Sequence, residues 1–368
     1  MNFPCIKINL NKIADNAKFI NDRCAQCGIS VIGVTKSILA DINIVKILKK
    51  SGIKVFGDSR LLNLQKLRNY FGYGQELVML RTPMLSECEA LVEICDISLQ
   101  TELETVKLLS AICSRKKITH NIIIMIEMDD RREGIYPSEV LNFFDTVYTN
   151  YKNINIIGLG TNARCISKKK PTLKSIENLI SLRNKIKKIY NYTIPLISGG
   201  NSSLWKYIAS GTLPGEVNQI RVGEAIFIGN ETASYERIEE LHDDSFMLEC
   251  EVIEVKEKKG DIYKAILALG LQDVNRRHMK IENPCYKIAG QSSDHTVLEL
   301  KKEFHYLKNT SSNSNIMPEY NYFKNSNINY VASFMELNVG SIVSFKLDYF
   351  GLLSCMTSPF VIKKYIGA

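Results

Sequence analysis

Short apolar runs alternate with amphipathic stretches along the first 230 residues of the chain. Each run is rich in Val, Ile and Leu and has the length of a buried strand. Each intervening stretch, such as residues 40–52 or 173–191, places its apolar residues at the spacing of one helix face. Eight such repeats predict an α/β fold, a (β/α)8 barrel of the TIM type. The eight expected strands contain Val31, Val55, Val78, Ile97, Ile124, Ile157, Leu196 and Arg221.

The pattern changes after about residue 230. Runs such as residues 245–255, 263–274 and 341–350 alternate apolar with polar positions and have no long helical stretches between them, which predicts an antiparallel β domain. We therefore expect residues 1–230 to form the barrel domain and residues 231–368 to form a C-terminal β domain. Residues 304–332 are polar, rich in Asn and nearly without pattern, which predicts a long loop insertion.

Composition argues against two classes of partner. The 47 Lys and Arg exceed the 39 Asp and Glu, for a net charge of +8. The lysines are scattered over helix faces, which argues against a nucleic-acid surface. No run of about 18 apolar residues is present and the N-terminus lacks the zones of a signal peptide, so we expect a cytoplasmic protein with no membrane partner. The ten cysteines are dispersed and are expected to be thiols.

Polar residues follow most of the expected barrel strands. In a TIM barrel the carboxyl ends of the strands converge on one mouth, where the chemistry takes place. A lysine, several arginines and a small-residue turn at one mouth favour a site for an anionic ligand. These residues are Lys36, Asp58, Arg60, Arg81, Gln100, the cluster from Asp129 to Arg132, Asn162, the run from Ser198 to Ser203, and Arg221.

The run "ISGGNSS" after the seventh strand has the residues of a phosphate cradle. Its glycines let the backbone approach a ligand, and Asn201, Ser202 and Ser203 supply donors. The same run also makes an ordinary turn, but "RVGE" from Arg221 supplies a second turn facing the same place. A phosphate site opposite Lys36 indicates pyridoxal 5′-phosphate held as a Schiff base.

Several longer phrases are shared with a known family. They include "VTKSILAD", "FGDSR", "RREGIYP", "ISGGNSS", "RVGEAIFIGNET" and "GQSSDH". On these phrases the chain resembles the pyridoxal phosphate-dependent, fold-type III alanine racemase family, and within it the alanine/ornithine racemase-like branch. The resemblance covers nearly the whole chain apart from the Asn-rich insertion and a hairpin near Lys259, which is shorter than usual in the family. It implies an amino-acid racemase, an isomerase that works as a homodimer with shared active sites.

The resemblance also implies roles for single residues. Lys36 matches the lysine that forms the Schiff base, and Arg221 matches the arginine that hydrogen-bonds the pyridine nitrogen. Ser202, with the backbone amides of Gly223 and Glu224, matches the ligands of the phosphate. An arginine rather than a glutamate at position 221 favours a racemase over a decarboxylase, because it leaves the ring nitrogen unprotonated.

Further positions match less closely. Arg132 falls where the family places an arginine that steadies the cofactor and the substrate carboxylate, although the adjacent Arg131 leaves the register open. Asn162, a candidate substrate-binding residue, stands where a histidine commonly stacks on the cofactor ring. Ala40 stands where a tyrosine usually helps to hold the phosphate.

The second catalytic base is missing from its usual position. Two-base racemisation needs an acid or base on each face of the Cα atom, and Lys36 serves one face. The alanine racemases carry a tyrosine where this chain has Leu271. We expect Asp273, Asp294 or His295 to serve the other face, with Tyr349 as a further option.

Two alternatives and the substrate remain open. A pyridoxal phosphate homeostasis protein shares the barrel and the lysine but lacks the β domain. A retro-aldol enzyme on β-hydroxy amino acids would need a metal, and the five histidines follow no ligand pattern. The branch implies alanine, ornithine or another small or basic amino acid, whose distal ammonium Asp58, Glu102 or Asp129 would receive.

Overall fold

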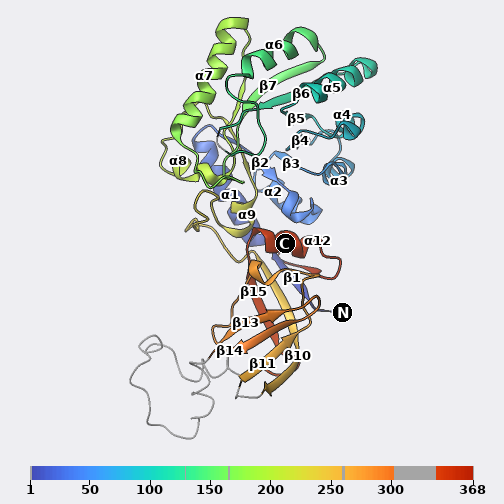
Figure 1. The fold of residues 1–368 in the computed structure, drawn as a ribbon, viewed down its shortest axis with the longest axis vertical. Coiled ribbons are helices and arrows are strands. Elements are labelled where there is room, and N and C mark those ends of the chain that lie inside the picture. The colour runs from blue at the N-terminus through green and yellow to red at the C-terminus, as the bar shows by residue number, and fades with distance from the viewer. Residues whose placement is uncertain (1, 129, 165, 259–261, 302–336, 368) are drawn as a thin grey trace. The chain divides into compact units, whose positions relative to one another are not determined.

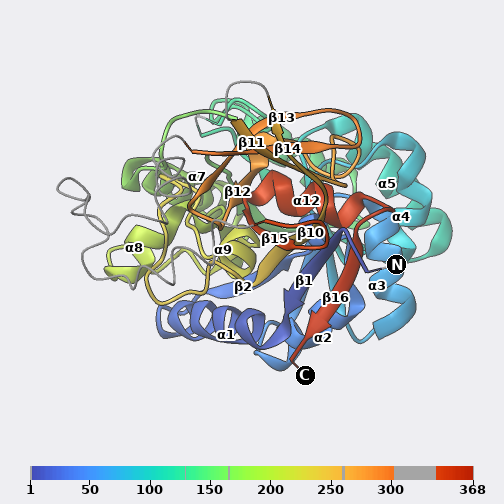
Figure 2. The same ribbon diagram turned by 90° about the horizontal axis from the view of Figure 1, so that it is seen from below.

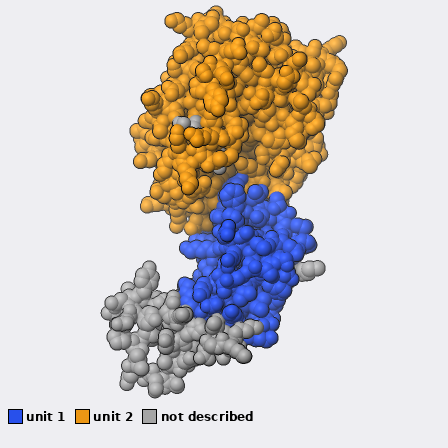
Figure 3. Space-filling model, viewed as in Figure 1, with its two compact units in different colours: residues 1–9, 244–368 blue, residues 10–243 orange. Residues whose placement is uncertain are grey.

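The computed structural model describes residues 2–128, 130–164, 166–258, 262–301 and 337–367. The chain forms two compact units, Leu10–Asp243 and Met1–Asn9 together with Asp244–Ala368 (Figure 3). The Asn-rich insertion expected at residues 304–332 lies outside the described residues, as does Asp129. Among the described residues, no helix combines the length and hydropathy that crossing a membrane requires.

The first unit, Leu10–Asp243, is a closed barrel of eight parallel strands, which confirms the expected TIM-type fold (Figure 1). Every strand expected from the sequence is present. The strands are β2 (Ser30–Val34), β3 (Val55–Asp58), β4 (Glu76–Met79), β5 (Ile97–Gln100), β6 (His120–Met125), β7 (Ile154–Gly160), β8 (Leu196–Ser198) and β9 (Gln219–Val222).

Helices follow the strands and cover the outside of the barrel (Figure 1). They are α1 (Leu10–Gln26), α2 (Ile42–Lys50), α3 (Leu61–Phe71), α4 (Cys88–Ile94), α5 (Leu103–Lys116), α6 (Val140–Asn150), α7 (Leu173–Tyr190), α8 (Trp205–Ala209) and α9 (Glu224–Ile228). Local sequence explains their ends. The Asp41 side chain accepts hydrogen bonds from the backbone N–H groups of Asn43 and Ile44 and so caps α2. Asn191 adopts a left-handed conformation at the end of α7.

Alternate residues of the strands fill the barrel interior. Apolar side chains from β2, β4, β5 and β6 form a buried cluster, and burying each such side chain contributes about 1.5–3 kcal/mol. Its members are Ile32, Val78, Ile97, Leu99, Ile123 and Met125. Residues that pair across two adjacent strands project their side chains to the same face of the sheet. A residue paired with a member of this cluster on the next strand therefore also points into the barrel.

One buried arginine on the outside of the barrel donates hydrogen bonds to three backbone carbonyl groups near α3 and α4. Arg68 of α3 is only 5% exposed. Its guanidinium group donates hydrogen bonds to the carbonyl oxygens of Ile94, Gly72 and Gln75 at 2.8–2.9 Å. It also pairs with Asp96 Oδ2 at 2.7 Å. The backbone around α3 therefore depends on a single side chain for several of its hydrogen bonds.

The second unit is built on an eight-stranded sheet, which confirms the expected β domain. Strands pair in the order β12, β15, β10, β11, β14, β13, and all these pairs are antiparallel. The elements are β10 (Phe246–Lys258), β11 (Ile262–Leu267), β12 (Met279–Ile281), β13 (Tyr286–Gln291), β14 (Thr296–Leu300), β15 (Ile342–Leu347), α12 (Tyr349–Thr357) and β16 (Ile362–Ile366).

The N-terminus belongs to this second unit rather than to the barrel. β1 (Cys5–Asn9) pairs antiparallel with β10 and parallel with β16 (Figure 2). The sequence predicted a barrel domain of residues 1–230, whereas the barrel unit spans Leu10–Asp243. The difference arises because both partners of β1 lie more than 230 positions along the chain, where a local pattern does not reveal them.

Candidate active site

Lys36 lies at the barrel mouth, just beyond β2. The strand ends at Val34, and Lys36 opens a one-turn 3-10 helix, Lys36–Ile38. The sequence predicted the lysine at the carboxyl end of this strand, and the structure places it two residues beyond the end of β2, in a turn. Leu39 and Ala40, which complete this turn, have positive φ angles of 49° and 47°.

Arg221 is buried inside the barrel at the same end. It lies in register with Ile32 of the interior cluster, so its side chain projects inward. The guanidinium group is 6% exposed and donates hydrogen bonds to Ser198 Oγ and to the carbonyl oxygen of Thr161, each at 2.5 Å. These contacts fix a permanent cation between β7, β8 and β9.

The expected phosphate cradle forms a compact turn after β8. Asn201 Oδ1 accepts a hydrogen bond from the backbone N–H of Ser203 at 2.8 Å, and Ser202 Oγ donates to Thr232 Oγ1 at 3.3 Å. Ser203 Oγ is buried and has no hydrogen-bond partner among the described residues. An unsatisfied buried hydroxyl is costly, so this one fits a phosphate oxygen as its acceptor.

Gly223 forms the other side of the cradle. A Cβ atom at this position would lie 2.9 Å from the Val34 carbonyl oxygen, on the strand that leads to Lys36. Glu224 begins α9. The backbone N–H groups in the first turn of a helix have no acceptor within that helix, so they can donate to a ligand. The residues present on both sides of the cradle therefore fit the phosphate of pyridoxal phosphate.

Substituting Gly223→Ala is expected to weaken pyridoxal phosphate binding by about tenfold or more, because the added methyl group forces the turn away from β2. The measurement is the dissociation constant, followed by cofactor absorbance. Gly215→Ala is the matched control, since a Cβ at Gly215 meets nothing within 4 Å. Equal affinities for the two variants would contradict this account of the cradle.

A chain of hydrogen bonds links the loops around the mouth. Asn162 Nδ2 donates to Asp130 Oδ2 at 3.2 Å, and Asn201 Nδ2 approaches Asn162 Oδ1 at 3.4 Å. Thr232 Oγ1 donates to Asn201 Oδ1 at 2.8 Å. Asn162 was expected to bind substrate, and the structure brings it together with Asn201 of the cradle. Thr232 was not among the residues predicted for the site, because its contact with Asn201 depends on a loop folded back from beyond α9.

Arg132 and Arg131 differ in their surroundings. The Arg132 guanidinium group pairs with Glu133 at 2.5 Å, and its Nε lies 4.0 Å from Asp130 Oδ2. Arg131 is exposed, adopts a positive φ of 55°, and its backbone N–H donates to Glu127 Oε1. Of the two arginines, Arg132 is therefore the one next to the hydrogen-bonded chain through Asn162.

The acidic groups expected to receive a distal ammonium are placed differently. Asp58 is fully buried and accepts hydrogen bonds from Thr35 and Asn63, so it is not available to a substrate. Glu102 is exposed at the start of α5. The expectation for Asp58 is wrong because its strand position did not reveal which side of the barrel wall it faces.

The candidates for the second base lie together in the β unit. The loops at residues 269–274 and 291–296 pair through two backbone hydrogen bonds, from Leu271 N to Ser292 O and from Gln272 N to Ser293 O. Gly270 permits this approach, because a Cβ there would lie 2.2 Å from the Ser293 carbonyl oxygen. Leu271, expected to stand at the position of a catalytic tyrosine, is thus adjacent to the loop that carries the other candidates.

These candidates differ in burial and in hydrogen bonding. Asp273 is 8% exposed and accepts hydrogen bonds from Gly270 N and Ser358 Oγ. Asp294 is exposed and lies 3.1 Å from His295 Nδ1. Hydrogen bonds from Ser292 and from its other neighbours lower the pKa of Asp294 below its ordinary value. Asp294 and His295 form an exposed pair, whereas Asp273 is hydrogen-bonded inside the unit.

Tyr349, the further candidate, is the first residue of α12.

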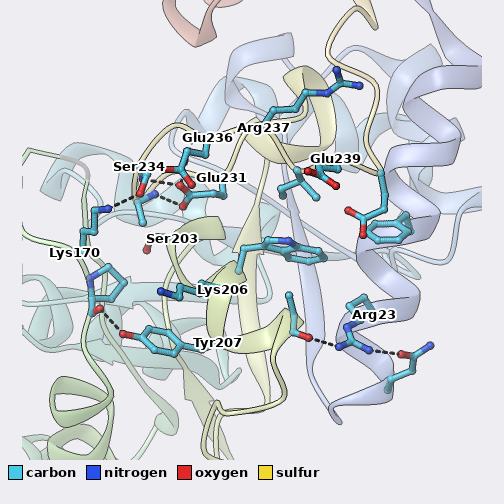
Figure 4. Close-up of a pocket in the computed structure, with 18 of the residues that line it drawn as sticks. Arg23, Lys170, Ser203, Lys206, Tyr207, Glu231, Ser234, Glu236, Arg237 and Glu239 are labelled. Atoms are coloured by element: carbon cyan, nitrogen blue, oxygen red, sulfur yellow. Dashed lines mark hydrogen bonds between the residues drawn. The ribbon is translucent and has the colours of Figure 1, made fainter.

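A separate hollow of about 990 Å³ lies beside α1 and α8 (Figure 4). Ser203 of the cradle contributes to its lining, together with Trp205 and Phe19. Both acidic and basic side chains line it, among them Arg23, Lys170, Lys206, Glu231, Glu236 and Arg237. Ser203 is the residue that this hollow shares with the cradle, and neither Lys36 nor Arg221 lines it.

Known proteins resemble the chain over its full length. A model of the alanine racemase N-terminal domain matches residues 8–231. The ornithine racemase of Acetoanaerobium sticklandii is 31% identical, and the match covers 99% of this chain and 100% of that protein. The lysine racemase of Thermotoga maritima is 30% identical, with 99% of each protein covered.

A solved structure shares the fold of the whole chain. The alanine racemase from Corynebacterium glutamicum superimposes with a TM-score of 0.73 at 17% identity, and the match covers 100% of both chains. This similarity confirms the combination of a barrel and a β domain. The family model and the two full-length relatives confirm the expected enzyme class, an amino-acid racemase, and the chain belongs to the alanine racemase family.

Proposed function

We propose that this protein is a pyridoxal phosphate-dependent racemase of a basic amino acid such as ornithine or lysine. One observation carries the proposal. Lys36 follows β2, Arg221 lies on β9, and the cradle follows β8. These three strands are neighbours in the closed barrel. The names of the two full-length relatives support a basic substrate.

The residues at the mouth fit the cofactor. Lys36 would hold it covalently through Nζ, and Arg221 would donate a hydrogen bond to its ring nitrogen. Ser202, Ser203 and the amides of Gly223 and Glu224 would hold its phosphate. When bound, the cofactor acidifies the α-proton of the substrate. Because Arg221 has no proton to give up near neutral pH, it donates a hydrogen bond without protonating the ring.

The remaining steps belong to the chain's own side chains. Arg132 would bind the substrate carboxylate as a fork-shaped donor, exchanging its pairing with Glu133 for the substrate. Lys36 Nζ would take or return the α-proton on one face of the Cα atom. His295, oriented by Asp294, would do so on the other face.

We propose further that the active enzyme is a homodimer in the cytoplasm. The acid or base opposite Lys36 would come from the β unit of a second copy of the chain, so each active site would be shared. The nine described cysteines are free thiols, which supports a reducing compartment.

Proton exchange in D₂O tests the function. Protein saturated with pyridoxal phosphate is incubated with a panel of L-amino acids, and loss of the α-proton signal and formation of the D-isomer are followed. Ornithine or lysine should exchange fastest. A protein that binds the cofactor at Lys36 but exchanges no α-proton would instead be a pyridoxal phosphate-binding protein.

Substituting His295→Gln is expected to reduce exchange of one enantiomer by about 100-fold or more, because one face of the Cα atom loses its acid or base. Cofactor absorbance should not change. His278→Gln is the matched control, because His278 Nδ1 lies 2.9 Å from Asp348 Oδ2 in a similar exposed pair of the same unit. A loss in Asp273→Asn with normal exchange in His295→Gln would move the role to Asp273.

A further inference from the structure

Asp58 is a buried carboxylate directly behind the Lys36 turn, and it is 0% exposed. Asp58 Oδ2 accepts hydrogen bonds from Thr35 Oγ1 at 2.7 Å and from Asn63 Nδ2 at 3.1 Å. Asp58 Oδ1 accepts one from the backbone N–H of Arg60 at 2.8 Å. Burial raises the pKa of Asp58, and the bond from Thr35 is the largest effect in the opposite direction.

The turn that carries Lys36 is strained. Leu39 and Ala40 both have positive φ angles, and a left-handed conformation costs roughly 1–2 kcal/mol for a residue with a side chain. Such strain persists only where the surrounding contacts determine the conformation. The turn therefore needs anchors outside its own few residues.

The following strand and helix supply those anchors. The Thr35 backbone N–H donates to the Gly57 carbonyl oxygen at 3.0 Å, and the Thr35 hydroxyl donates to Asp58. At the other end of the turn, Lys66 Nζ of α3 donates to the Leu39 carbonyl oxygen at 3.3 Å. The conformation around Lys36 thus depends on β3 and α3, with Asp58 as the buried contact.

We propose that Asp58 is a positioning residue for Lys36, holding Thr35 so that the strained turn keeps the lysine at the barrel mouth. This inference rests on the proposed role of Lys36 in cofactor binding. Asp58 reaches the Lys36 turn through its hydrogen bond with Thr35, and the nearby Lys36 ammonium also lowers the pKa of Asp58.

A pair of variants tests the role by first breaking and then restoring a hydrogen bond of Asp58. In Asp58→Asn the amide keeps a single acceptor oxygen. When that oxygen accepts from the Arg60 backbone N–H, the new NH2 group faces both the Thr35 hydroxyl and the Asn63 amide donor. The double variant Asp58→Asn with Asn63→Asp restores one acceptor and one donor at that contact. A slower rate of adduct formation that results from the lost hydrogen bond should therefore recover in the double variant.

Two probes separate the lysine from the cradle. Pyridoxal phosphate reports on Lys36 through the absorbance of the covalent adduct. Pyridoxine 5′-phosphate has no aldehyde and reports only on the phosphate and ring contacts. In Asp58→Asn, adduct formation should slow by about tenfold or more while pyridoxine phosphate affinity stays within about twofold. The double variant should recover to within about threefold of the wild-type rate.

Each other outcome has a defined meaning. Adduct formation at the wild-type rate in Asp58→Asn, equal losses with both probes, or no recovery in the double variant would overturn the inference. If Asp58→Asn does not fold, Thr35→Val should slow the adduct where Thr35→Ser does not, and equal rates would overturn it. A wild-type protein that forms no adduct would instead refute the proposed function.

Discussion

Lys36→Ala should lower kcat for racemisation by at least about 1000-fold while the free energy of unfolding changes little. The reason is that Lys36 lies in a turn beyond β2 rather than within the barrel core. The substitution removes both the covalent attachment of the cofactor and one of the two proton-transfer groups. Initial rates with each enantiomer, together with urea unfolding, measure the two quantities.

Lys50→Ala is the control for Lys36→Ala. Lys50 is exposed at the end of α2, close in sequence to the active lysine. Lys50→Ala should racemise the substrate at the wild-type rate in the same assay. Added methylamine should restore part of the activity of Lys36→Ala, since a free amine replaces the missing one. Activity within tenfold of wild type in Lys36→Ala would refute its assignment.

Arg68→Met should lower the free energy of unfolding by about 3–5 kcal/mol without any direct effect on the active site. The substitution removes the Arg68 donors to three carbonyl oxygens and to Asp96 Oδ2, which keeps its hydrogen bond from the Leu77 backbone N–H. Unsatisfied buried acceptors cost more than the hydrogen bonds themselves contribute. The midpoint of urea unfolding measures the loss.

Arg115→Ala is the matched control for Arg68→Met. Arg115 pairs with Glu89, but both side chains are exposed. Exposed pairs contribute little because water competes for the same groups. The change in unfolding free energy should therefore be small beside that of Arg68→Met. Similar losses in the two variants would show that burial does not set the stability in this part of the barrel.

Much of the fold was predictable because its signals are local. The eight barrel strands are continuous apolar runs, and consecutive strands of a barrel deliver their ends to one mouth. Lys36 and Arg221 were placed correctly for that reason. β1 was missed because its short run leads directly into α1 and its partners lie at the far end of the chain.

The supporting contacts of the site were not predictable from the sequence. The bond from Thr35 to Asp58 and the chain from Asn162 to Thr232 join loops that only the closed barrel brings together. The sequence placed Asp58 at a strand end but did not reveal that it is buried behind the turn. Asp273 was similarly indistinguishable from Asp294 until its burial was known.

The pairing of β1 with β16 bears on how the protein is synthesised. β1 leaves the ribosome before the barrel unit and its partner β16 leaves after it, so every residue of the barrel unit emerges between the two strands. The barrel can therefore fold during translation, whereas the pair of β1 and β16 forms only after the whole barrel unit has emerged. A recombinant barrel fragment should begin at Leu10, because an earlier start would carry a strand with both of its edges unpaired.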